Sequence, residues 1–230
     1  YIVPNDGKYF LRLSDVFSSY TAAFRVYRPP MESQPAGTRQ ILYLDFEGGI
    51  VSRNQFGLGP ESVYFQPMRS FLLDPTLENV IIDEVIARTA SKFEQVGIST
   101  TNPNYGVAIR NSRDHGDLWG LPNVSRIIVG DVRDLADDDP FNGLLGIAEH
   151  IDVGNFDTQS TALVRFIPHA VSSGFVPISP VSNLVQVAGE LLASTIAHEA
   201  GHFFGLWHQD PTNTNIGIMD TTVDTLDDAG

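Results

Sequence analysis

The chain has 230 residues and a net charge of −14, with 42% hydrophobic and 18% charged residues. This length allows one sizeable hydrophobic core, and the composition is that of a globular protein rather than a disordered one. The excess of 28 acidic over 14 basic side chains disfavours nucleic acid and anionic membranes as partners. No apolar run is long enough to span a bilayer. The lack of cysteine excludes disulfides, thiolate metal sites and cysteine nucleophiles.

The first 38 residues differ from the rest because they show no sustained hydrophobic period. The stretch RPPMESQPAG, residues 28–37, is typical of an extended linker, since its prolines disfavour both a helix and a central strand. We therefore expect residues 1–38 to form an N-terminal arm packed on the main domain or a remnant of a pro-segment, and residues 39–230 to form one domain. The chain begins at Tyr1 with no visible signal peptide, which indicates a processed start.

Hydrophobic periodicity predicts an α/β order for the main domain. Alternating apolar and polar residues predict a strand at 39–47 that stops at Gly48. Asp74 and Pro75 can begin a helix as N-cap and first-turn proline, and apolar residues follow at helical spacing to about residue 96. Short strands are expected at 106–110, 125–130 and 160–166, and a second long helix from Ser182 or Asn183 to Gly205. This order predicts one twisted sheet covered by both helices.

The stretch STIAHEAGHFFGLWHQD, residues 194–210, contains three of the chain's six histidines. His198 and His202 are four residues apart, so on a helix their imidazoles project from one face and can share one zinc ion. Glu199 flanks that ion, where it can accept a proton from metal-bound water. Gly205 can end the helix with a left-handed turn that returns His208 as a third ligand. Three protein ligands leave a fourth position for water, as in catalytic zinc sites.

An alternative interpretation is a buried helix that contains stray histidines, since Phe203, Phe204, Leu206 and Trp207 would suit a hydrophobic core. The five fixed positions of H-E-x-x-H-x-x-G-x-x-H, however, occur by chance with a probability on the order of 10⁻⁵. The pattern therefore favours the metal site.

Residues 198–208 resemble the zinc signature of the metzincin metallopeptidases. That family has a methionine in a turn beneath the metal, and Met219 in NIGIMD is similar in position. The resemblance implies a metzincin-like twisted mixed sheet with a backing helix and an active-site helix, one catalytic zinc, and a secreted or extracellular protein in which residues 39–230 are the catalytic domain. Thr221 stands where astacin-like and serralysin-like relatives have a tyrosine. Only eleven residues follow Met219, so a short C-terminal part is expected.

The matrixin branch of that family is similar over the stretch before the second helix, where RIIVG and ALVRF resemble its strand and edge strand. Matrixins bind a second, structural zinc with histidines in the intervening loop, but the loop here is acidic, so a second zinc is not expected. Its carboxylates can instead bind calcium or form a solvated loop; they are Asp131, Asp134, Asp137, Asp138 and Asp139. We interpret His115 as a surface turn residue and assign no partner to His169.

These features predict a zinc-dependent endopeptidase in which Glu199 activates water held by the metal and then protonates the leaving amine. The substrate is expected to be an extended polypeptide that pairs with an edge strand at 162–166. Phe203, Phe204 and the stretch after His208 are candidate pocket walls. Two alternatives remain: a catalytically silent metal-binding fold that serves as a protein-binding module, and a zinc hydrolase of small amides. The sequence indicates no oligomeric state.

Overall fold

The computed structural model describes residues 29–72, 74–132, 141, 144–166, 183–209 and 217–219, together with Phe10 and Thr21. Pro30–Ser33, within the predicted linker, form a short 3-10 helix (η1) instead of an extended segment, because proline is tolerated in a first helical turn. No helix among the described residues is long and apolar enough to cross a membrane. Several predicted features lie outside the described residues, namely most of the N-terminal arm, Asp134, Asp137, Asp138, Asp139, His169, Ser182 and Thr221.

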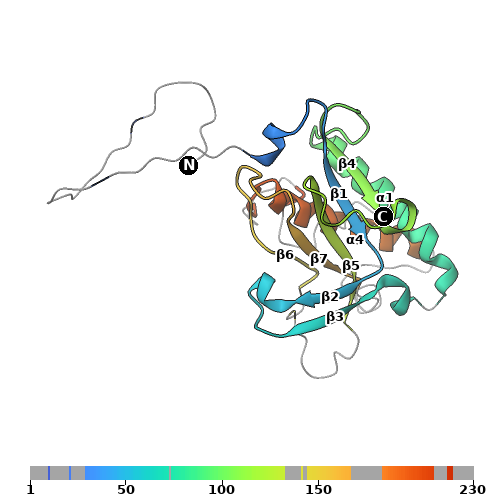
Figure 1. The fold of residues 1–230 in the computed structure, drawn as a ribbon. Helices are drawn as coiled ribbons and strands as arrows, with labels where there is room; N and C mark the ends of the chain where they lie inside the picture. Colours follow the sequence, from blue (N-terminus) through green and yellow to red (C-terminus); the bar gives the residue numbers. More distant parts are fainter. Residues whose placement is uncertain are drawn as a thin grey trace.

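A mixed sheet of seven strands forms the centre of the fold (Figure 1). The strands are β1 Gln40–Asp45, β2 Gly49–Ser52, β3 Ser62–Pro67, β4 Val107–Asn111, β5 Val124–Asp131, β6 Gly146–Ala148 and β7 Thr161–Arg165. Four of them run parallel in the order β4–β1–β5–β7, and β6 adds to β7 in the antiparallel direction. β2 and β3 form an antiparallel pair, and β3 also pairs with the end of β5.

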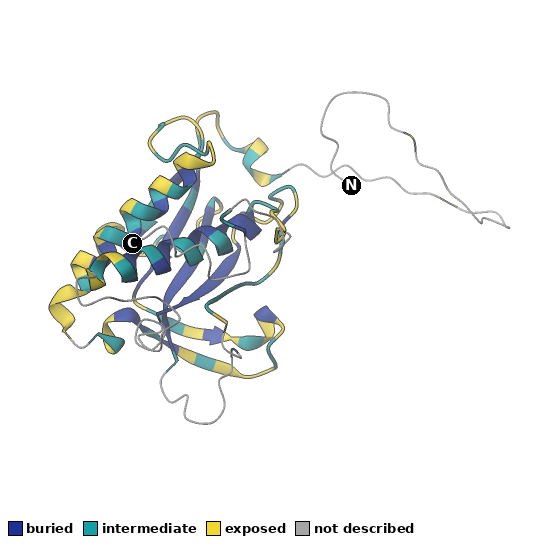
Figure 2. Cartoon of the chain, turned by 180° about the vertical axis from the view of Figure 1, so that it is seen from behind, coloured by how far each residue is buried: buried dark blue, intermediate teal, exposed yellow. Residues whose placement is uncertain are grey.

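Two long helices, α1 (Glu78–Gln95) and α4 (Leu184–Phe203), lie side by side on one face of the sheet (Figure 2). They pack on alternate residues of the central strands, among them Leu42 and Leu44 of β1 and Ile127 of β5. This confirms the predicted α/β arrangement, with one large hydrophobic core between the helices and the sheet. The shorter helices are η2 Arg53–Phe56, η3 Met68–Phe71, η4 Pro75–Leu77 and α2 Ser112–His115.

A second hydrophobic cluster lies on the opposite face of the sheet. Ile128 of β5 and Leu163 of β7 belong to it, together with Phe65 of β3 and Phe141. The rings of Phe65 and Phe141 meet edge to face, with centroids 6.0 Å apart. β5 and β7 are therefore buried on both faces, which accounts for their almost continuous apolar sequences.

A side-chain cap begins α4, and another begins the short turn before α1. Oδ1 of Asn183 accepts hydrogen bonds from the N–H groups of Val185 and Gln186 at 3.1 and 3.4 Å, which confirms one of the two predicted caps. Asp74 accepts from the N–H of Thr76 at 3.0 Å as predicted, but the turn that it caps is η4, and the α-helix itself begins at Glu78. α4 ends at Phe203, before the predicted end at residue 205.

The strand predicted as the edge of the sheet is an internal strand. β7 pairs with β5 on one side and with β6 on the other, so its backbone groups are already bonded. Among the described strands β6 is the edge on this side of the sheet, and it lies next to α4. The sequence does not predict β6 because three residues are too few to show a period. It does not predict β2 and β3 because the apolar residues Ile50 and Tyr64 face solvent. The expected alternation of buried apolar and exposed polar residues is therefore not visible in these two strands.

Candidate metal centre

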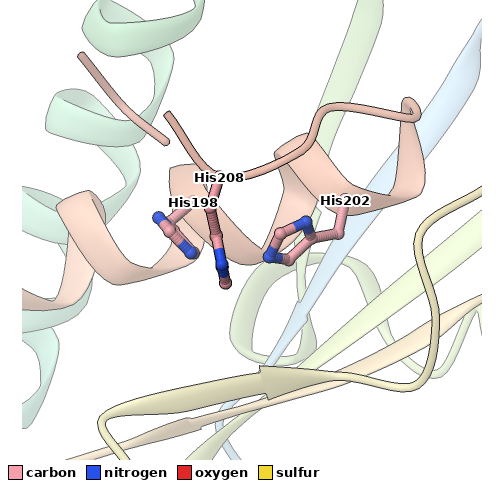
Figure 3. Close-up of side chains that lie close together, drawn as sticks. All are labelled: His198, His202 and His208. Carbon is pink, nitrogen blue, oxygen red and sulfur yellow. The ribbon is translucent and has the colours of Figure 1, made fainter. Parts of the chain in front are cut away.

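The three histidines of the predicted site lie together at the end of α4 (Figure 3). His198 and His202 project from the helix, and His208 returns from the chain that follows it. One ring nitrogen of each histidine lies within 4.8 Å of the other two, and the ring centroids are 4.9 to 5.1 Å apart. This arrangement brings together three imidazole donors that can hold one metal ion.

Backbone carbonyl groups orient two of the three rings. Nδ1 of His198 lies 2.9 Å from the carbonyl oxygen of Ile218, and Nδ1 of His202 lies 2.9 Å from that of Leu206. Because a carbonyl oxygen only accepts hydrogen bonds, we place the hydrogen on Nδ1 and the lone pair on Nε2, which is the tautomer that a metal needs. Burial lowers the pKa of His202, the Leu206 carbonyl opposes this shift, and nearby His208 adds to it. The net shift favours the neutral ring.

A tight reversal after α4 brings His208 back to the site. The N–H of Leu206 donates to the carbonyl of Gly201, and the N–H of Gly205 donates to that of His202, both at 3.0 Å. These two bonds form the Schellman motif that ends many helices. The predicted left-handed turn at Gly205 is confirmed by its φ of +82°, and a β-carbon there would also lie 2.7 Å from Cα of Val153. Both the backbone conformation and the close packing require glycine.

The carboxyl group of Glu199 is buried against the edge strand β6. The residue is 5% exposed, and the backbone N–H of Ala148 donates a hydrogen bond to its carboxylate. Burial raises the pKa of Glu199 to about 8, and the hydrogen bond from Ala148 opposes that rise. A carboxyl group whose pKa lies near neutrality can both accept and release a proton at pH 7.

Met219 is buried against the helix that carries two of the histidines. It is 2% exposed, and its sulfur occupies the space that a β-carbon at Gly201 would need. Its carbonyl accepts a hydrogen bond of 3.0 Å from the N–H of Gln209, the residue after His208. Its neighbour Ile218 supplies the carbonyl that orients His198. The segment with the predicted methionine therefore contacts the site through both side chain and backbone.

Asp131, one of the predicted calcium ligands, belongs to a buried ion pair. The residue is 3% exposed, and its Oδ1 lies 2.8 Å from Nε of Arg165 in β7. The same oxygen accepts the N–H of Val132. Arg165 supplies the countercharge that a buried carboxylate needs. Asp131 is thus part of the sheet core, and the other four aspartates lie outside the described residues.

A second group of potential metal ligands follows β6. Glu149, His150 and Asp157 each bring one ligand atom to within 4.8 Å of the others, so the group is compatible with a cation. Glu149 also accepts hydrogen bonds from the N–H of Thr161 and the amide of Gln55 at 2.8 and 2.5 Å. These bonds hold the segment between β6 and β7 to the sheet and to η2.

The structure places the candidate pocket walls Phe203 and Phe204 in the core. Phe203 is fully buried, and the ring of Phe204 packs edge to face on Phe93 with centroids 6.2 Å apart. The exposed apolar residues next to the histidines are instead Leu206 and Trp207, at 42% and 68% exposure. His115 is exposed at the end of α2, in agreement with its interpretation as a surface residue.

Several functional positions give no sequence signal because they act through backbone atoms. The carbonyls of Leu206 and Ile218 orient histidines, and the N–H of Ala148 contacts Glu199. Gly146 lies so close to α4 that a β-carbon there would be 2.5 Å from Oε1 of Glu199. Leu206 could be found from the sequence only because it lies close to the end of the helix. No sequence pattern indicates Ile218, Ala148 or Gly146.

No protein-family model matches the chain, and a search of curated proteins finds no match. An assignment of function therefore depends on the residues of this site.

Proposed function

We propose that the protein is a secreted zinc-dependent endopeptidase of the metzincin type, which cleaves peptide bonds in extended polypeptides. The observation that carries this proposal is the convergence of three imidazoles beside a buried glutamate on the same helix. The zinc signature in residues 198–208, the buried Met219 and the mixed sheet with two helices on one face support the family. Secretion rests on that family resemblance.

The donor set fits zinc. Three neutral imidazole nitrogens are a common ligand set of catalytic zinc, whereas calcium and magnesium prefer oxygen ligands. The carbonyl groups of Leu206 and Ile218 fix two of the rings with Nε2 as the donor. A zinc ion bound there would act as a Lewis acid on water and on the scissile carbonyl, and its charge would favour the ionised form of Glu199.

Glu199 provides the proton transfer. In its ionised form the carboxylate takes a proton from the attacking water and then passes it to the nitrogen of the leaving amine. The hydrogen bond from Ala148 fixes the direction of the carboxylate, and burial keeps bulk water away from it. The same group thus serves first as base and then as acid, and no second titratable side chain is required.

β6 is the strand to which an extended substrate can bind. The N–H of Arg165 donates to the carbonyl of Leu145, and the N–H of Glu149 donates to that of Thr161, so residues 145 and 149 face β7. By alternation, the backbone groups of Gly146 and Ala148 face away from β7, towards the side on which Glu199 contacts Ala148. A peptide that pairs with this edge would lie beside the catalytic glutamate. This favours polypeptide over small amide substrates.

The proposal is tested with three variants of the whole chain. Glu199→Gln should cleave an unfolded protein at least 100-fold more slowly than the parent while it still binds one zinc per chain. His202→Ala should lose both zinc and cleavage, and His115→Ala, a histidine on the surface, should change neither. Unchanged cleavage by Glu199→Gln would rule out the mechanism.

The two alternatives predict different results in the same assays. A silent metal-binding fold would bind zinc but cleave neither peptides nor proteins after chelation and zinc restoration. A small-amide hydrolase would act on short amides and leave an unfolded protein intact. Digestion of a peptide library, with metal analysis of the same sample, separates all three.

A further inference from the structure

The edge strand β6 positions Glu199 in two ways, through a hydrogen bond at Ala148 and through an absent side chain at Gly146. At Ala148 the contact is a hydrogen bond from the backbone N–H to the carboxylate. At Gly146 the side chain of Glu199 occupies space that a β-carbon would need, because such a carbon would lie 2.5 Å from Oε1 and 2.9 Å from Cγ of Glu199. The hydrogen bond attracts the carboxylate to the strand, and the missing β-carbon leaves the space in which it lies.

We propose that Gly146 is a positioning residue for Glu199: the absence of a side chain at residue 146 leaves the space in which the catalytic carboxylate lies, within reach of the Ala148 N–H. This inference rests on the proposed peptidase function, since it concerns the base of that reaction. The φ of Gly146 lies outside the left-handed region, so any residue can adopt its backbone conformation. Glycine is therefore needed here for space and not for backbone freedom.

The atoms that crowd Gly146 determine what a larger residue would do. Oε1 of Glu199 is the end of a flexible side chain, so an alanine at residue 146 would displace it instead of unfolding the strand. A carbon and an oxygen in ordinary contact are roughly 3.4 Å apart, so the carboxylate would move by about 1 Å. A displacement of about 1 Å in a catalytic group can cost on the order of 100-fold in rate.

A second contact at Gly146 provides a way to isolate this effect. The same β-carbon would lie 2.8 Å from Cγ2 of Thr195, whose hydroxyl donates to the carbonyl of Leu191 at 3.0 Å. Thr195→Ser removes that methyl group and keeps the hydroxyl. In a Thr195→Ser background, Gly146→Ala therefore crowds Glu199 without crowding this methyl group.

The test is a double-mutant cycle of Gly146→Ala and Glu199→Asp, in both the parent and the Thr195→Ser chain. Gly146→Ala should lower kcat roughly 10- to 100-fold, with KM changed less than about twofold and zinc still at one per chain. Aspartate is one methylene shorter and leaves room for the new methyl group. The loss caused by Glu199→Asp should therefore be several-fold smaller with Ala at residue 146 than with Gly. His115→Ala, at the exposed end of α2, is the control and should leave kcat unchanged.

A measurement that needs no activity keeps this inference separate from the peptidase proposal. A hydrogen bond to a carboxylate moves the amide proton of Ala148 downfield in an NMR spectrum. Gly146→Ala should move that signal upfield, as should Glu199→Gln, whereas His115→Ala should not. An unchanged Ala148 signal, or additive losses in the cycle, would overturn the role of Gly146. If the parent chain itself cleaves no peptide bonds, the peptidase proposal is overturned. The Ala148 amide signal would still show whether Gly146 positions the carboxylate of Glu199.

Discussion

The sulfur of Met219 fills the space beside Gly201 that a β-carbon would otherwise take. Gly201 lies next to His202 on α4, and Met219 follows Ile218, whose carbonyl orients His198. A contact between one glycine and one methionine thus connects the helix to the segment beneath it. Packing at this point therefore supports the segment whose carbonyl orients the ring of His198.

Gly201→Ala is expected to push Met219 out of this position. We expect a loss of about 1–3 kcal/mol in the free energy of unfolding, and a weaker affinity for zinc because Ile218 moves with Met219. Met219→Ala removes the overlapping sulfur, so the double variant should be more stable than the sum of the two single losses implies. Thermal unfolding and zinc titration of the four proteins measure both effects, and strict additivity would show that the contact is not the cause.

Gly205→Ala combines backbone strain with crowding, and Gly97 offers a matched control. Both glycines have a φ of +82°, but a β-carbon at Gly97 has no neighbour within 4 Å, whereas at Gly205 it would lie 2.7 Å from Cα of Val153. Gly97→Ala should cost about 1–2 kcal/mol from the left-handed conformation alone. Gly205→Ala should cost at least 1 kcal/mol more and also weaken zinc binding. Equal losses in urea unfolding would mean that the approach of Val153 is unimportant.

Metal removal should lower the stability of the folded chain. A ligand at 100 times its dissociation constant stabilises the native state by about 2.7 kcal/mol, so added zinc should raise the Tm and a chelator should reverse the rise. His202→Ala should abolish the rise. His150→Ala removes a histidine of the second cluster, and the zinc response should survive it. If His150→Ala also loses the response, the second cluster contributes to zinc binding.

Glu190 makes the packing of the two helices sensitive to acid. Burial acts to raise its pKa, but hydrogen bonds from Lys92 and Arg88, at 2.5 and 2.6 Å, outweigh burial and leave the pKa below its ordinary value. A lowered folded-state pKa stabilises the protein at pH values above the unfolded pKa of about 4.3. This stabilisation, on the order of 1 kcal/mol, disappears as the pH falls from there through the folded-state value.

Glu190→Gln should therefore lower stability at pH 7 and have little effect at pH 2.5, measured by urea unfolding at each pH. Glu61→Gln is the matched control, because the Glu61 side chain is 75% exposed in its ion pair with Arg53. Its removal should change stability at pH 7 by only a few tenths of a kcal/mol. A loss from Glu190→Gln that persists unchanged at pH 2.5 would point to packing instead of charge.

Asp131→Asn tests the ion pair in the sheet core. The variant removes the carboxylate that neutralises Arg165, so we expect a loss of about 3–5 kcal/mol in the free energy of unfolding. Added calcium should not change the stability of the parent through this residue, because Asp131 is 3% exposed and bonded to Arg165. A calcium-dependent rise in Tm that Asp131→Asn abolishes would contradict this role.

The sequence predicts the helical half of the histidine cluster well because helix geometry alone places residues four apart on one face. His198, His202 and the turn at Gly205 follow from that local rule, and Asn183 follows from the preference for polar caps. The spacing does not specify which side of a helix faces the core. Phe203 and Phe204 are for that reason assigned to a pocket by sequence and to the core by the structure.

Contacts between distant segments are the part that the sequence does not specify. Asp131 belongs to an acidic run, but its partner Arg165 is 34 residues away, so local composition suggests a solvated or calcium-binding loop. The edge position of β6 depends on the pairing order of the whole sheet. Gly146 and Ala148 act on Glu199 through a missing side chain and a backbone N–H, neither of which leaves a pattern in the sequence.

The hydrogen bond from Gln209 to the carbonyl of Met219 joins the end of the histidine segment to the start of the next part of the chain. Gly217 lies against the side chain of Gln209 as well, since a β-carbon there would be 2.6 Å from its Oε1. The two ends of the intervening segment are thus held together independently of its length. Since doubling a loop costs only about 0.6 kcal/mol in closure entropy, insertions between Gln209 and Gly217 are expected to leave the histidine cluster intact. The spacing between the two parts of the chain that support His198 is therefore free to vary without loss of the histidine cluster.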